Sequence, residues 1–364
     1  GMRGGEYVLE AIAEMFPQAE LFTLVHVPDS VTPPITSLKR HVSPLQRVPG
    51  IEKRYRHFLP VMPKLIERFD LSGFDLVVSS SHCVAKGVRK APGAVHVTFV
   101  HAPMRYVWDR YDDYFGPGRA SLPVRAAAFG VRGFLQRWDR ESSSPQRIDA
   151  ITCNSRFIAG RIREAWGREA RVIYPFADLS RFTQPRKPGR NYVMVGAFAP
   201  YKRVDLAIEA FNRLKLPLLI VGSGQDEERA RRAAGPTIEF LGSLSNSAIA
   251  DLFAKGRAFI FPAKEDFGIT PVEALAAGLP VIAFGEGGAA ETVTPETGLH
   301  FRPQTVDALC EAVRKFESGA VEFSEDACRR RAANFTRQRF QHELMETIRE
   351  VWTKAGKGQF TLRS

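Results

Sequence analysis

The stretch RAFIFPAKEDFGITPVEALAAGLPVIAFGEGGAAE, residues 257–291, decides the fold of this chain. It holds two short apolar runs, 258–261 and 281–284, which are typical of strands buried on both faces of a parallel sheet. Between these runs, Thr270 matches the N-cap of a helix, Pro271 its first helical residue and Glu273 the capping-box partner of Thr270. The stretch therefore predicts a strand, a polar loop, a short helix and a second strand.

Two carboxylates, Glu265 and Glu273, fall in the loop and the first helical turn after the first of these strands. Ligands of open parallel sheets bind at the carboxyl ends of the strands, where loops meet helix N-termini. An ionised carboxylate only accepts hydrogen bonds, so two of them suit a partner rich in hydroxyl groups, such as a ribose or a sugar ring. The alternative is that Glu273 only caps its helix and that Glu265 is a solvated loop acid.

Apolar runs and helical patterns also alternate along the rest of the chain, and a length of 364 residues suggests about two domains. The alternation occurs on both sides of a Pro-rich segment at 174–189, which predicts two parallel sheets covered by helices. Before that segment we expect strands at 21–27, 74–79, 94–100, 149–153 and 170–173, with helices at 8–15, 54–69, 122–141 and 154–166. After it we expect strands at 191–195, 217–221 and 237–240, with helices at 202–214, 225–234, 246–255 and 336–353.

The composition is that of an ordinary globular protein, since 44% of the residues are apolar and 25% are charged, which excludes a disordered class. The formal net charge of +11 predicts affinity for anions, whether nucleic acid, an acidic membrane surface or a phosphorylated small molecule. The four cysteines are widely spaced and lack metal-ligand spacing, so we expect reduced thiols. We find neither a run long enough to span a bilayer nor a secretion signal. These features together predict a cytoplasmic protein.

Two cations follow the strand expected at 191–195, because the chain continues through Gly196 to Lys202 and Arg203 near the start of a helix. Cations at the carboxyl end of a strand favour an anion site, and in a first helical turn they oppose the helix dipole. The alternative is a pair of solvated helix-end residues.

Two glycine-rich turns offer backbone amides to a ligand. Gly222 and Gly224 would let the backbone approach a nucleotide, although a lone Gly-x-Gly mostly indicates a tight turn. Gly287 and Gly288, before a helix expected from residue 289, form a better phosphate cradle. No Asp-x-Asp triplet is present to chelate a metal against a diphosphate, so we expect no metal site and a metal-independent reaction.

Seven residues, among them Phe267-Gly268, separate Glu265 from Glu273 in a Glu-x7-Glu pattern. The pattern also includes Pro271, Glu273-Ala274, Ala277-Gly278 and Pro280-Val281-Ile282. It resembles the donor-site signature of the family 4 retaining glycosyltransferases. Members have the α/β GT-B fold, in which two Rossmann-like domains face each other across a cleft and the C-terminal helix crosses back to the first domain. The resemblance implies that Glu265 approaches the transferred sugar, Glu273 holds the ribose and Lys202 binds the diphosphate. It extends the implied donor site to Gly4, Gly5, Gly196, Arg203, Gly222, Gly224, Leu244, Phe267, Gly268 and Ile269.

The chain departs from the family pattern in two places. Ala197 stands where the family has an Arg directly after the glycine, which leaves Arg203 or another cation to bind the diphosphate beside Lys202. A first buried strand precedes the Gly-Gly loop in relatives, and no residues before Gly4 are present to form it.

The string HAPMRYVWD, residues 101–109, is similar to one found in mannosyltransferase-type members that build O-antigen and related polysaccharides. From the residues alone, a single His at a strand end is more often structural. The resemblance implies that His101 contacts the transferred sugar near its reacting carbon and that Arg105 lies close by, on the acceptor side. His101, Lys202 and Glu265 are then the implied catalytic set. The implied donor is GDP-mannose, without a cofactor, and the implied acceptor is a saccharide or a polyprenyl-linked saccharide.

The resemblance also divides the chain into an acceptor-side domain at 1–185, a nucleotide-sugar domain at 186–337, and a helix and tail at 338–364 that pack back on the first domain. The helix expected at 122–141 carries four arginines among apolar residues. We favour a buried helix with a solvated basic face, and the alternative is a helix that lies on an anionic membrane. The second interpretation would place the protein peripherally on the inner face of the cytoplasmic membrane.

A non-catalytic basic protein that binds nucleic acid or anionic lipid is the alternative function. It predicts basic residues interleaved with stacking aromatics, which the sequence does not show, so we expect no nucleic-acid partner. It also leaves Glu265 and Glu273 unexplained. A dinucleotide-dependent enzyme would need a G-x-G-x-x-G sequence at the start of a βαβ unit, and none occurs. The sequence therefore favours an enzyme that transfers a hexose from a nucleotide sugar.

Overall fold

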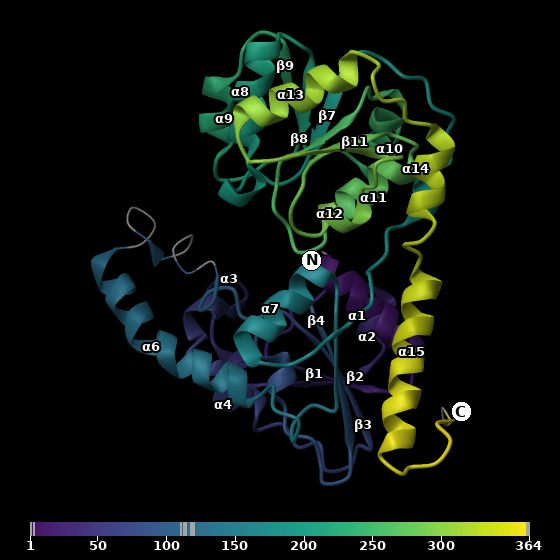
Figure 1. The fold of residues 1–364 in the computed structure, drawn as a ribbon. Helices are drawn as coiled ribbons and strands as arrows, with labels where there is room; N and C mark the ends of the chain where they lie inside the picture. The colour runs from purple at the N-terminus through teal and green to yellow at the C-terminus, as the bar shows by residue number, and fades with distance from the viewer. Residues whose placement is uncertain (1, 3, 110, 112–114, 117–120, 362–364) are drawn as a thin grey trace. The chain divides into compact units, whose positions relative to one another are not determined.

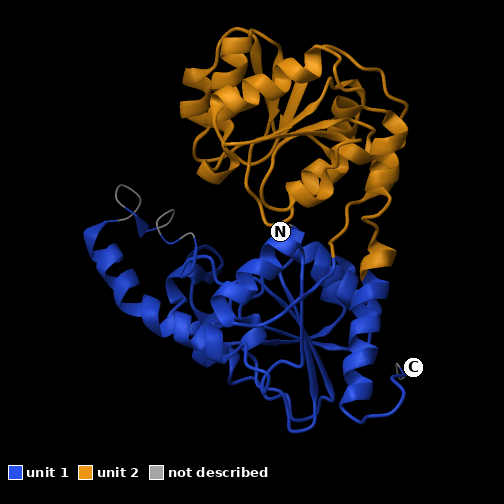
Figure 2. Ribbon diagram, viewed as in Figure 1, with its two compact units in different colours: residues 1–173, 341–364 blue, residues 174–340 orange. Residues whose placement is uncertain are grey.

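The computed structural model describes residues 2, 4–109, 111, 115–116 and 121–361. The chain forms two compact units, of which unit 1 comprises residues 1–173 and 341–364 and unit 2 comprises residues 174–340 (Figure 2). The boundary predicted between residues 185 and 186 falls within unit 2. The reason is that η4 (Leu179–Phe182), in the Pro-rich segment, packs on α10 (Asn246–Lys255) and α11 (Ile269–Ala276).

Unit 1 is built on a four-stranded parallel sheet in the order β3-β4-β5-β6, and a separate parallel pair joins β1 to β2 (Figure 1). All six residues of β4 are buried, as expected for a central strand with both faces covered. The strands are β1 (Glu20–Thr23), β2 (Lys39–Val42), β3 (Leu76–Ser81), β4 (Val95–Val100), β5 (Ala150–Cys153) and β6 (Arg171–Val172). The longer helices are α1 (Gly4–Met15), α6 (Leu122–Glu141), α7 (Arg156–Trp166) and α15 (Arg337–Lys354), of which α15 belongs to unit 1 from Gln341 on.

The helix predicted over 54–69 is wrong, because this segment forms short pieces. Two prolines, Pro60 and Pro63, lack the backbone N–H that a helix interior needs. The pieces of this region are α2 (Pro33–Thr36), η1 (Pro44–Arg47), α3 (Ile51–Arg54), η2 (Tyr55–Phe58), α4 (Met62–Ile66) and η3 (Ala85–Gly87).

Unit 2 contains a six-stranded parallel sheet in the order β12-β11-β10-β7-β8-β9. The chain starts in the middle at β7, builds outward to β9, returns to the other side of β7 at β10 and builds outward again. This is the order of a doubly wound fold, with its switch point between β7 and β10. The strands are β7 (Tyr192–Val195), β8 (Leu218–Val221), β9 (Ile238–Gly242), β10 (Phe259–Phe261), β11 (Val281–Phe284) and β12 (Gly298–Phe301). The remaining elements of the unit are η5 (Pro200–Lys202), α8 (Val204–Leu214), α9 (Glu227–Ala233), α12 (Ala289–Thr292), α13 (Val306–Glu317) and α14 (Glu325–Ala332).

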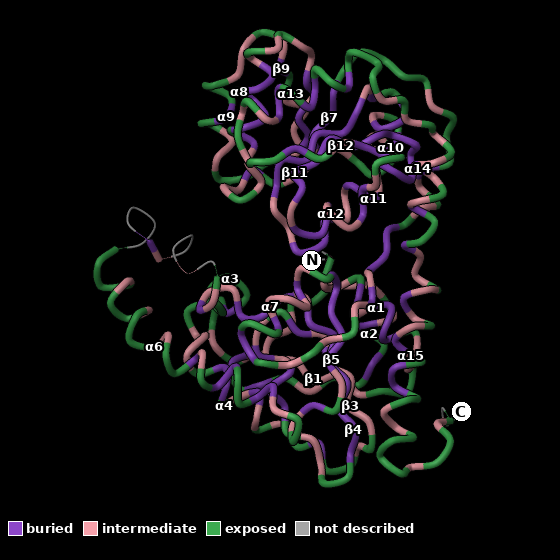
Figure 3. The backbone as a smooth tube through the Cα atoms, viewed as in Figure 1, coloured by how far each residue is buried: buried purple, intermediate pink, exposed green. Residues whose placement is uncertain are grey.

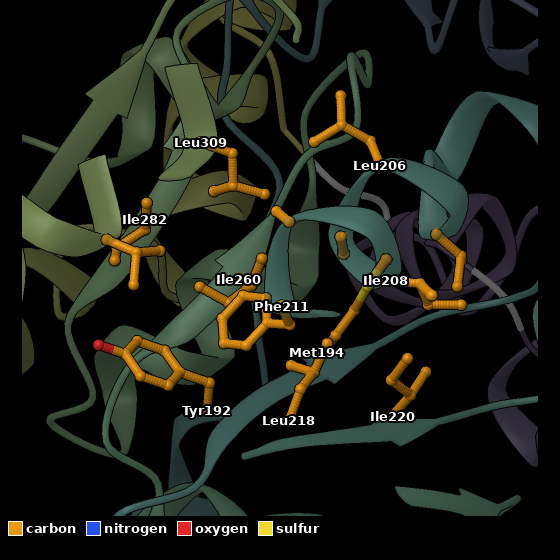
Figure 4. Packing of buried hydrophobic residues seen from close by; sticks show 14 of the residues in the cluster. Tyr192, Met194, Leu206, Ile208, Phe211, Leu218, Ile220, Ile260, Ile282 and Leu309 are labelled. Carbon is orange, nitrogen blue, oxygen red and sulfur yellow. The ribbon is translucent and has the colours of Figure 1, made fainter. Parts of the chain in front are cut away.

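Apolar side chains cover both faces of this sheet, which explains the continuous apolar runs of its strands. Tyr192 and Met194 of β7 point into one cluster (Figure 4), while Val193 between them packs in a second cluster on the other face. In the same way Ile260 joins the first cluster, and its neighbours Phe259 and Phe261 join the second. Alternation of this kind fixes the register of each strand, because a slip by one residue would exchange the two faces.

Within the described part of the chain, no helix combines the length and the apolar character needed to cross a bilayer.

Candidate active site

The loops after β7 and β10 meet at the switch point of unit 2. The chain leaves β7 and reaches Lys202 at the end of η5, and β10 is followed by the loop that carries Glu265. Lys202 Nζ and Glu265 Oε1 form an ion pair whose two side chains are 15% and 19% exposed. These residues are 63 positions apart in the sequence, and the strand order brings them together. The structure thus joins two members of the predicted catalytic set.

An ion pair at this edge suits a ligand that has both phosphate and hydroxyl groups. An ammonium group has three donors, so Lys202 can hold Glu265 and still donate to phosphate oxygens. The carboxylate of Glu265 has acceptor sites left for sugar hydroxyls. Hydrogen bonds between charged groups are the strong ones, and here a strong donor and a strong acceptor lie at one point of the sheet edge.

Close backbone contacts shape the loops around this pair. A Cβ atom at Gly222 would lie 1.9 Å from the carbonyl oxygen of Gly196, and one at Gly224 would lie 2.6 Å from that of Phe198. Their φ angles are 138° and 157°, which favour glycine independently of the space. Gly196 also lies against the Lys202 side chain, since a Cβ atom there would be 3.9 Å from Nζ. These glycines bring the loops after β7 and β8 together, and their direct contact with a nucleotide stays a prediction.

Gly287 and Gly288 pack against the Glu265 loop, and the Gly288 amide is not available for the phosphate cradle predicted there, while the role of the Gly287 amide stays a prediction. The amide of Gly288 donates to the carbonyl oxygen of Glu265 at 2.8 Å, and a Cβ atom at Gly287 would lie 2.3 Å from the same oxygen. A backbone amide that is already bonded inside the protein is not available to a phosphate.

The helix α11 begins earlier than predicted. Its N-cap is Gly268, with φ of 79°, and Ile269 is the first helical residue, so Thr270 does not cap the helix. The structure shows no side-chain hydrogen bond at this N-cap. The capping-box interpretation of Glu273 is therefore wrong, and its carboxylate is engaged elsewhere.

Glu273 pairs with Arg181, a residue that the sequence analysis missed. Arg181 Nη1 lies 3.1 Å from Glu273 Oε1, and the side chains are 22% and 18% exposed. Burial raises the pKa of Glu273, and the charge and hydrogen bond of Arg181 partly oppose this. Arg181 belongs to η4, 92 positions before Glu273, and a lone Arg after the Pro-rich segment carries no sequence signal that marks it. Glu273, which we predicted to bind the ribose, is thus a half-buried acid that Arg181 holds in place.

Phe267 lies between β10 and α11, and Leu244 follows β9, and the contact of either residue with a donor stays a prediction. The ring of Phe267 is 4% exposed and packs against Tyr174 and Phe335, with centroid distances of 6.1 and 5.8 Å. Its side chain therefore serves the core, which leaves its backbone for a donor. Leu244 is half-buried after β9, beside Ser245, whose hydroxyl caps α10 by accepting from the amide of Ala248 at 3.2 Å.

Arg203, the cation that could replace the family's missing Arg, contacts other residues of unit 2 in this structure, and its role toward a diphosphate stays a prediction. It has left-handed backbone, with φ of 53°, and its guanidinium contacts Asp205 at 3.2 Å and Gln304 at 3.3 Å. Ala197, which stands at the family Arg position, is exposed at the end of β7. The site therefore has room for a longer side chain at residue 197.

His101 directly follows β4 in unit 1, so it lies at the carboxyl end of a parallel strand, as Lys202 and Glu265 do in unit 2. Its Nε2 lies 2.8 Å from the hydroxyl of Ser80, and its carbonyl oxygen accepts a hydrogen bond from Asn154 at 2.9 Å. Burial lowers the pKa of His101 to about 3, and the charges of His82 and Arg105 lower it further. The imidazole is therefore neutral across the range in which most enzymes work.

Gly5 lies beside His101, because a Cβ atom on Gly5 would be 3.8 Å from the ring atoms Cε1 and Nε2. Gly4 and Gly5 form the first turn of α1, where we expected a loop. The first amides of a helix have no intrahelical partner, so the predicted role of these glycines toward the donor stays open to test.

Arg105 belongs to the loop after His101. Its charge lowers the pKa of His101, of His82 and of Arg161, in each case after the larger effect of burial. Arg161 of α7 forms an ion pair with Asp109 at the end of the same loop. Arg105 is thus close to His101, as the resemblance implied, and its role toward an acceptor stays a prediction.

Comparison with known protein families assigns both units. A family model described as Glycosyltransferase Family 4 matches residues 2–181, and one described as Glycosyl transferases group 1 matches residues 177–335. This chain belongs to the family 4 glycosyltransferases. The predicted family is therefore confirmed, and the alternative of a non-catalytic basic protein has no support from these matches.

Several characterised relatives of this family 4 member are mannosyltransferases. A GDP-mannose-dependent monoacylated α-(1-6)-phosphatidylinositol monomannoside mannosyltransferase of Corynebacterium glutamicum is 31% identical over 217 residues, which are 51% of this chain and 55% of the relative. A GDP-mannose-dependent α-mannosyltransferase of Mycolicibacterium smegmatis is 36% identical over 197 residues, 52% of this chain and 50% of the relative. O-antigen chain mannosyltransferase C of Escherichia coli is 30% identical over 212 residues, 52% of this chain and 57% of the relative. The match with this chain thus spans about half the length of these relatives.

Solved structures of other glycosyltransferases share the whole fold. A sucrose-phosphate synthase from Thermosynechococcus elongatus has a TM-score of 0.68 at 19% identity, over 95% of this chain and 92% of that one. A lipopolysaccharide outer core galactosyltransferase has a TM-score of 0.67 at 16% identity, over 96% of both chains. The predicted GT-B fold with two Rossmann-like domains is confirmed.

Among the residues that the structure describes, no group of three or more His, Cys, Asp and Glu side chains is arranged to hold a metal ion. The expected metal-independent reaction stays a prediction.

Proposed function

We propose that this protein transfers a mannosyl group from GDP-mannose to a saccharide or polyprenyl-linked saccharide acceptor, with retention of the anomeric configuration and without a metal ion. The observation that carries the proposal is the Lys202–Glu265 ion pair at the switch point of unit 2, with the Arg181–Glu273 pair on the helix that follows. The named relatives support mannose as the sugar and GDP as the nucleotide.

The residues of unit 2 suit the departure of a diphosphate. As the bond between the anomeric carbon and the diphosphate oxygen breaks, negative charge grows on the leaving group and positive charge grows on the sugar ring. Lys202 stabilises the first charge and the carboxylate of Glu265 the second. The acceptor hydroxyl attacks from the face that the diphosphate leaves, and its proton passes to the departing phosphate oxygen. Glu273 accepts hydrogen bonds from the two ribose hydroxyls, which holds the nucleotide in place.

The neutral His101 suits a position beside the developing positive charge. A protonated imidazole there would repel the sugar cation, whereas a neutral one donates or accepts a hydrogen bond at no such cost. Because burial keeps the pKa of His101 near 3, its form does not change between pH 5 and pH 9.

A polyprenyl-linked acceptor would bring the enzyme to the inner face of the cytoplasmic membrane. The relative from Corynebacterium glutamicum is named for a phosphatidylinositol-linked acceptor, which supports a lipid-linked substrate for this chain also.

The proposal is tested by calorimetric titration of the protein with GDP, UDP and ADP, followed by NMR of the product formed from the sugar conjugate that binds best. We expect selective binding of GDP, and transfer from GDP-mannose that yields the α-anomer. Selective binding of UDP would overturn the donor but keep the transferase. Binding of no nucleotide, together with strongly salt-dependent binding of any polyanion, would instead support the non-catalytic alternative.

A further inference from the structure

Three segments of unit 2 meet at the C-terminal end of α11. The helix ends at Ala276, and both η4, from the Pro-rich segment, and α14, from the end of the unit, pack on it. Figure 3 draws α11 mostly as buried, with α14 beside it. The Arg181–Glu273 pair joins two of these segments, because Arg181 belongs to η4 and Glu273 to α11. The geometry of the pair therefore depends on how η4 and α11 are held together.

Arg329 of α14 binds both segments with one guanidinium group. Its Nη1 atom donates to the carbonyl oxygen of Phe182 at 2.5 Å and to that of Ala276 at 2.8 Å. Its Nη2 atom donates to the carbonyl oxygen of Gln184 at 2.6 Å and lies 3.5 Å from that of Ala277. One side chain thus links the Pro-rich segment to the end of α11 through four carbonyl groups.

These carbonyl groups adjoin the two members of the charged pair. Phe182 directly follows Arg181, and Ala276 lies three residues, or about one helical turn, after Glu273. The last carbonyl groups of a helix lack partners within it, and a cation at that end also interacts favourably with the helix dipole. The guanidinium therefore fixes the backbone beside the cation of the pair and the backbone one turn after its carboxylate.

Arg329 is itself held in one orientation. Its Nε atom donates to Glu325 Oε1 at 2.9 Å, one turn earlier in α14. Cys328 and Ala332, on either side of it in the sequence, are buried in the cluster that also contains Phe182. A guanidinium presents its N–H groups in a rigid planar fork, so it holds several acceptors in fixed directions, which the ammonium of a lysine cannot do.

We propose that Arg329 is a positioning residue of the donor site, which fixes η4 against α11 and so directs the Glu273 carboxylate toward the ribose. The inference rests on the proposed function, because it takes the role of Glu273 from there. Without Arg329 the two segments still pack through apolar side chains, but their carbonyl groups are no longer joined. Arg181 and Glu273 then shift together, and the carboxylate loses hydrogen bonds to the ribose, because these bonds weaken steeply outside their normal geometry.

Calorimetric titration of the protein with GDP and with 2′,3′-dideoxy-GDP, which lacks both ribose hydroxyl groups, tests the proposal. The wild type should prefer GDP about tenfold, because only GDP donates hydrogen bonds to Glu273. Arg329→Met should lower this preference to about twofold by weakening the binding of GDP alone. A smaller fraction of folded protein affects both ligands equally and cancels in the ratio, so a loss of stability does not imitate this result.

Two further variants separate positioning from charge. Arg329→Lys keeps a cation at the end of α11 but lacks the planar fork, so its preference for GDP should also fall. It gives the same comparison if Arg329→Met does not fold. Arg330→Met is the matched control, because Arg330 is the next residue of α14 and is exposed, and its preference should equal that of the wild type.

A double-mutant cycle shows whether Arg329 acts through Glu273. GDP should bind the double variant Arg329→Met with Glu273→Gln as tightly as it binds Glu273→Gln alone. Additive losses of GDP affinity would overturn the inference, and so would a wild-type preference for GDP that Arg329→Met leaves unchanged, although the ribose assignment would then stand. Equal binding of the two nucleotides by the wild type would instead contradict the proposed role of Glu273, and the inference with it.

Discussion

The carboxyl edges of the two sheets present polar groups in different ways. In unit 2 the edge carries charged pairs, Lys202–Glu265 and Arg181–Glu273, held by loops that touch at the backbone. In unit 1 the edge carries the neutral His101, bonded to a hydroxyl and an amide. Yet unit 1 has the larger net charge, +9 from 29 Lys and Arg against 20 Asp and Glu, whereas unit 2 has +2 from 22 against 20. Net charge therefore does not indicate where the proposed donor site lies, and our proposal rests instead on the paired charges at the switch point of unit 2.

The comparison also separates two ways of holding a site. Unit 2 relies on glycine contacts that leave no space for a side chain. Unit 1 relies on a buried ion pair, Lys86–Asp139, whose carboxylate also accepts a hydrogen bond from Trp108 of the loop after His101. Each device can be broken by one substitution that leaves the other unit untouched.

The largest effect is expected from Gly222→Ala. The new Cβ atom would lie 1.9 Å from the Gly196 carbonyl oxygen in a backbone conformation that alanine rarely adopts. We expect a loss of about 5 kcal/mol or more, enough to unfold unit 2 and abolish nucleotide binding. Calorimetric unfolding and GDP titration measure this. The control is Gly242→Ala, also at positive φ but with nothing within 4 Å, which should cost only about 1 kcal/mol. Equal losses for the two variants would contradict the role given to close backbone contact.

Lys86→Met should destabilise unit 1 by about 3 kcal/mol, because it leaves the buried carboxylate of Asp139 without its cation. Lys354→Met is the matched control, since Lys354 pairs with Glu350 at 2.7 Å but is 72% exposed, and its loss should cost less than about 0.5 kcal/mol. Thermal unfolding followed by tryptophan fluorescence reports on this region directly, because Lys86 Nζ lies 5.3 Å from the centre of the Trp138 ring and 4.6 Å from that of Trp166. GDP affinity should stay unchanged in both variants. A Lys86→Met protein as stable as the control would show that this pair does not anchor α6.

Apolar periodicity predicted most of the fold. The helices at 122–141 and 246–255 and the strand at 281–284 were predicted with the bounds that the structure has. The failure at 54–69 has a local cause, since prolines interrupt a pattern that is otherwise helical. Periodicity shows which face of a helix is apolar but not what covers that face. For this reason the sequence favoured a buried helix with a solvated basic face at 122–141. In the N-terminal half of α6, however, Leu122 is 76% exposed and Phe129 is 74% exposed, so apolar side chains also face solvent there.

The candidate site could be predicted only where the sequence motif and the strand order agree. The pairing of Lys202 with Glu265 follows from the doubly wound order, because both residues lie in segments that follow the strands flanking the switch point. Arg181 was missed because its partner is distant in the sequence and no motif surrounds it. Gly288 was assigned to phosphate because its internal acceptor, the Glu265 carbonyl oxygen, lies on another loop.

Glu273→Gln distinguishes a ligand from a structural acid in unit 2. If the carboxylate binds the ribose, its loss should weaken GDP binding about tenfold, which is about 1.4 kcal/mol. The folded-state pKa of Glu273 is raised, so its ionisation costs stability that is present at low pH and lost as the pH rises through that pKa. The neutral Gln should therefore not lower the melting temperature at pH 7.

The pH dependence gives a second measure of the same residue. GDP binding by the wild type should weaken as the pH falls through the raised pKa of Glu273, because the protonated acid accepts fewer hydrogen bonds. The Gln variant should lack this change. Unchanged GDP affinity in the variant at pH 7, or a fall in its melting temperature, would assign Glu273 to the structure instead of the ribose.

Ala197→Arg is expected to have the smallest effect, and the informative result is whether GDP binds more tightly or more weakly. Residue 197 is exposed directly after Gly196, whose own Cβ position lies 3.9 Å from Lys202 Nζ, so a guanidinium there can reach the ligand that Lys202 binds. A bidentate contact with a diphosphate should tighten GDP binding about fivefold, or about 1 kcal/mol. Ala197→Lys is the control for charge alone and should give a smaller gain, because an ammonium lacks the planar fork. Guanosine, which has no phosphate, should bind wild type and variant equally.

If instead Arg203 already supplies the missing cation, Arg203→Gln should weaken GDP binding and Ala197→Arg should restore it. A gain for guanosine as great as that for GDP would mean that residue 197 lies away from the diphosphate, and the charged edge of unit 2 would then have to bind it through Lys202 alone.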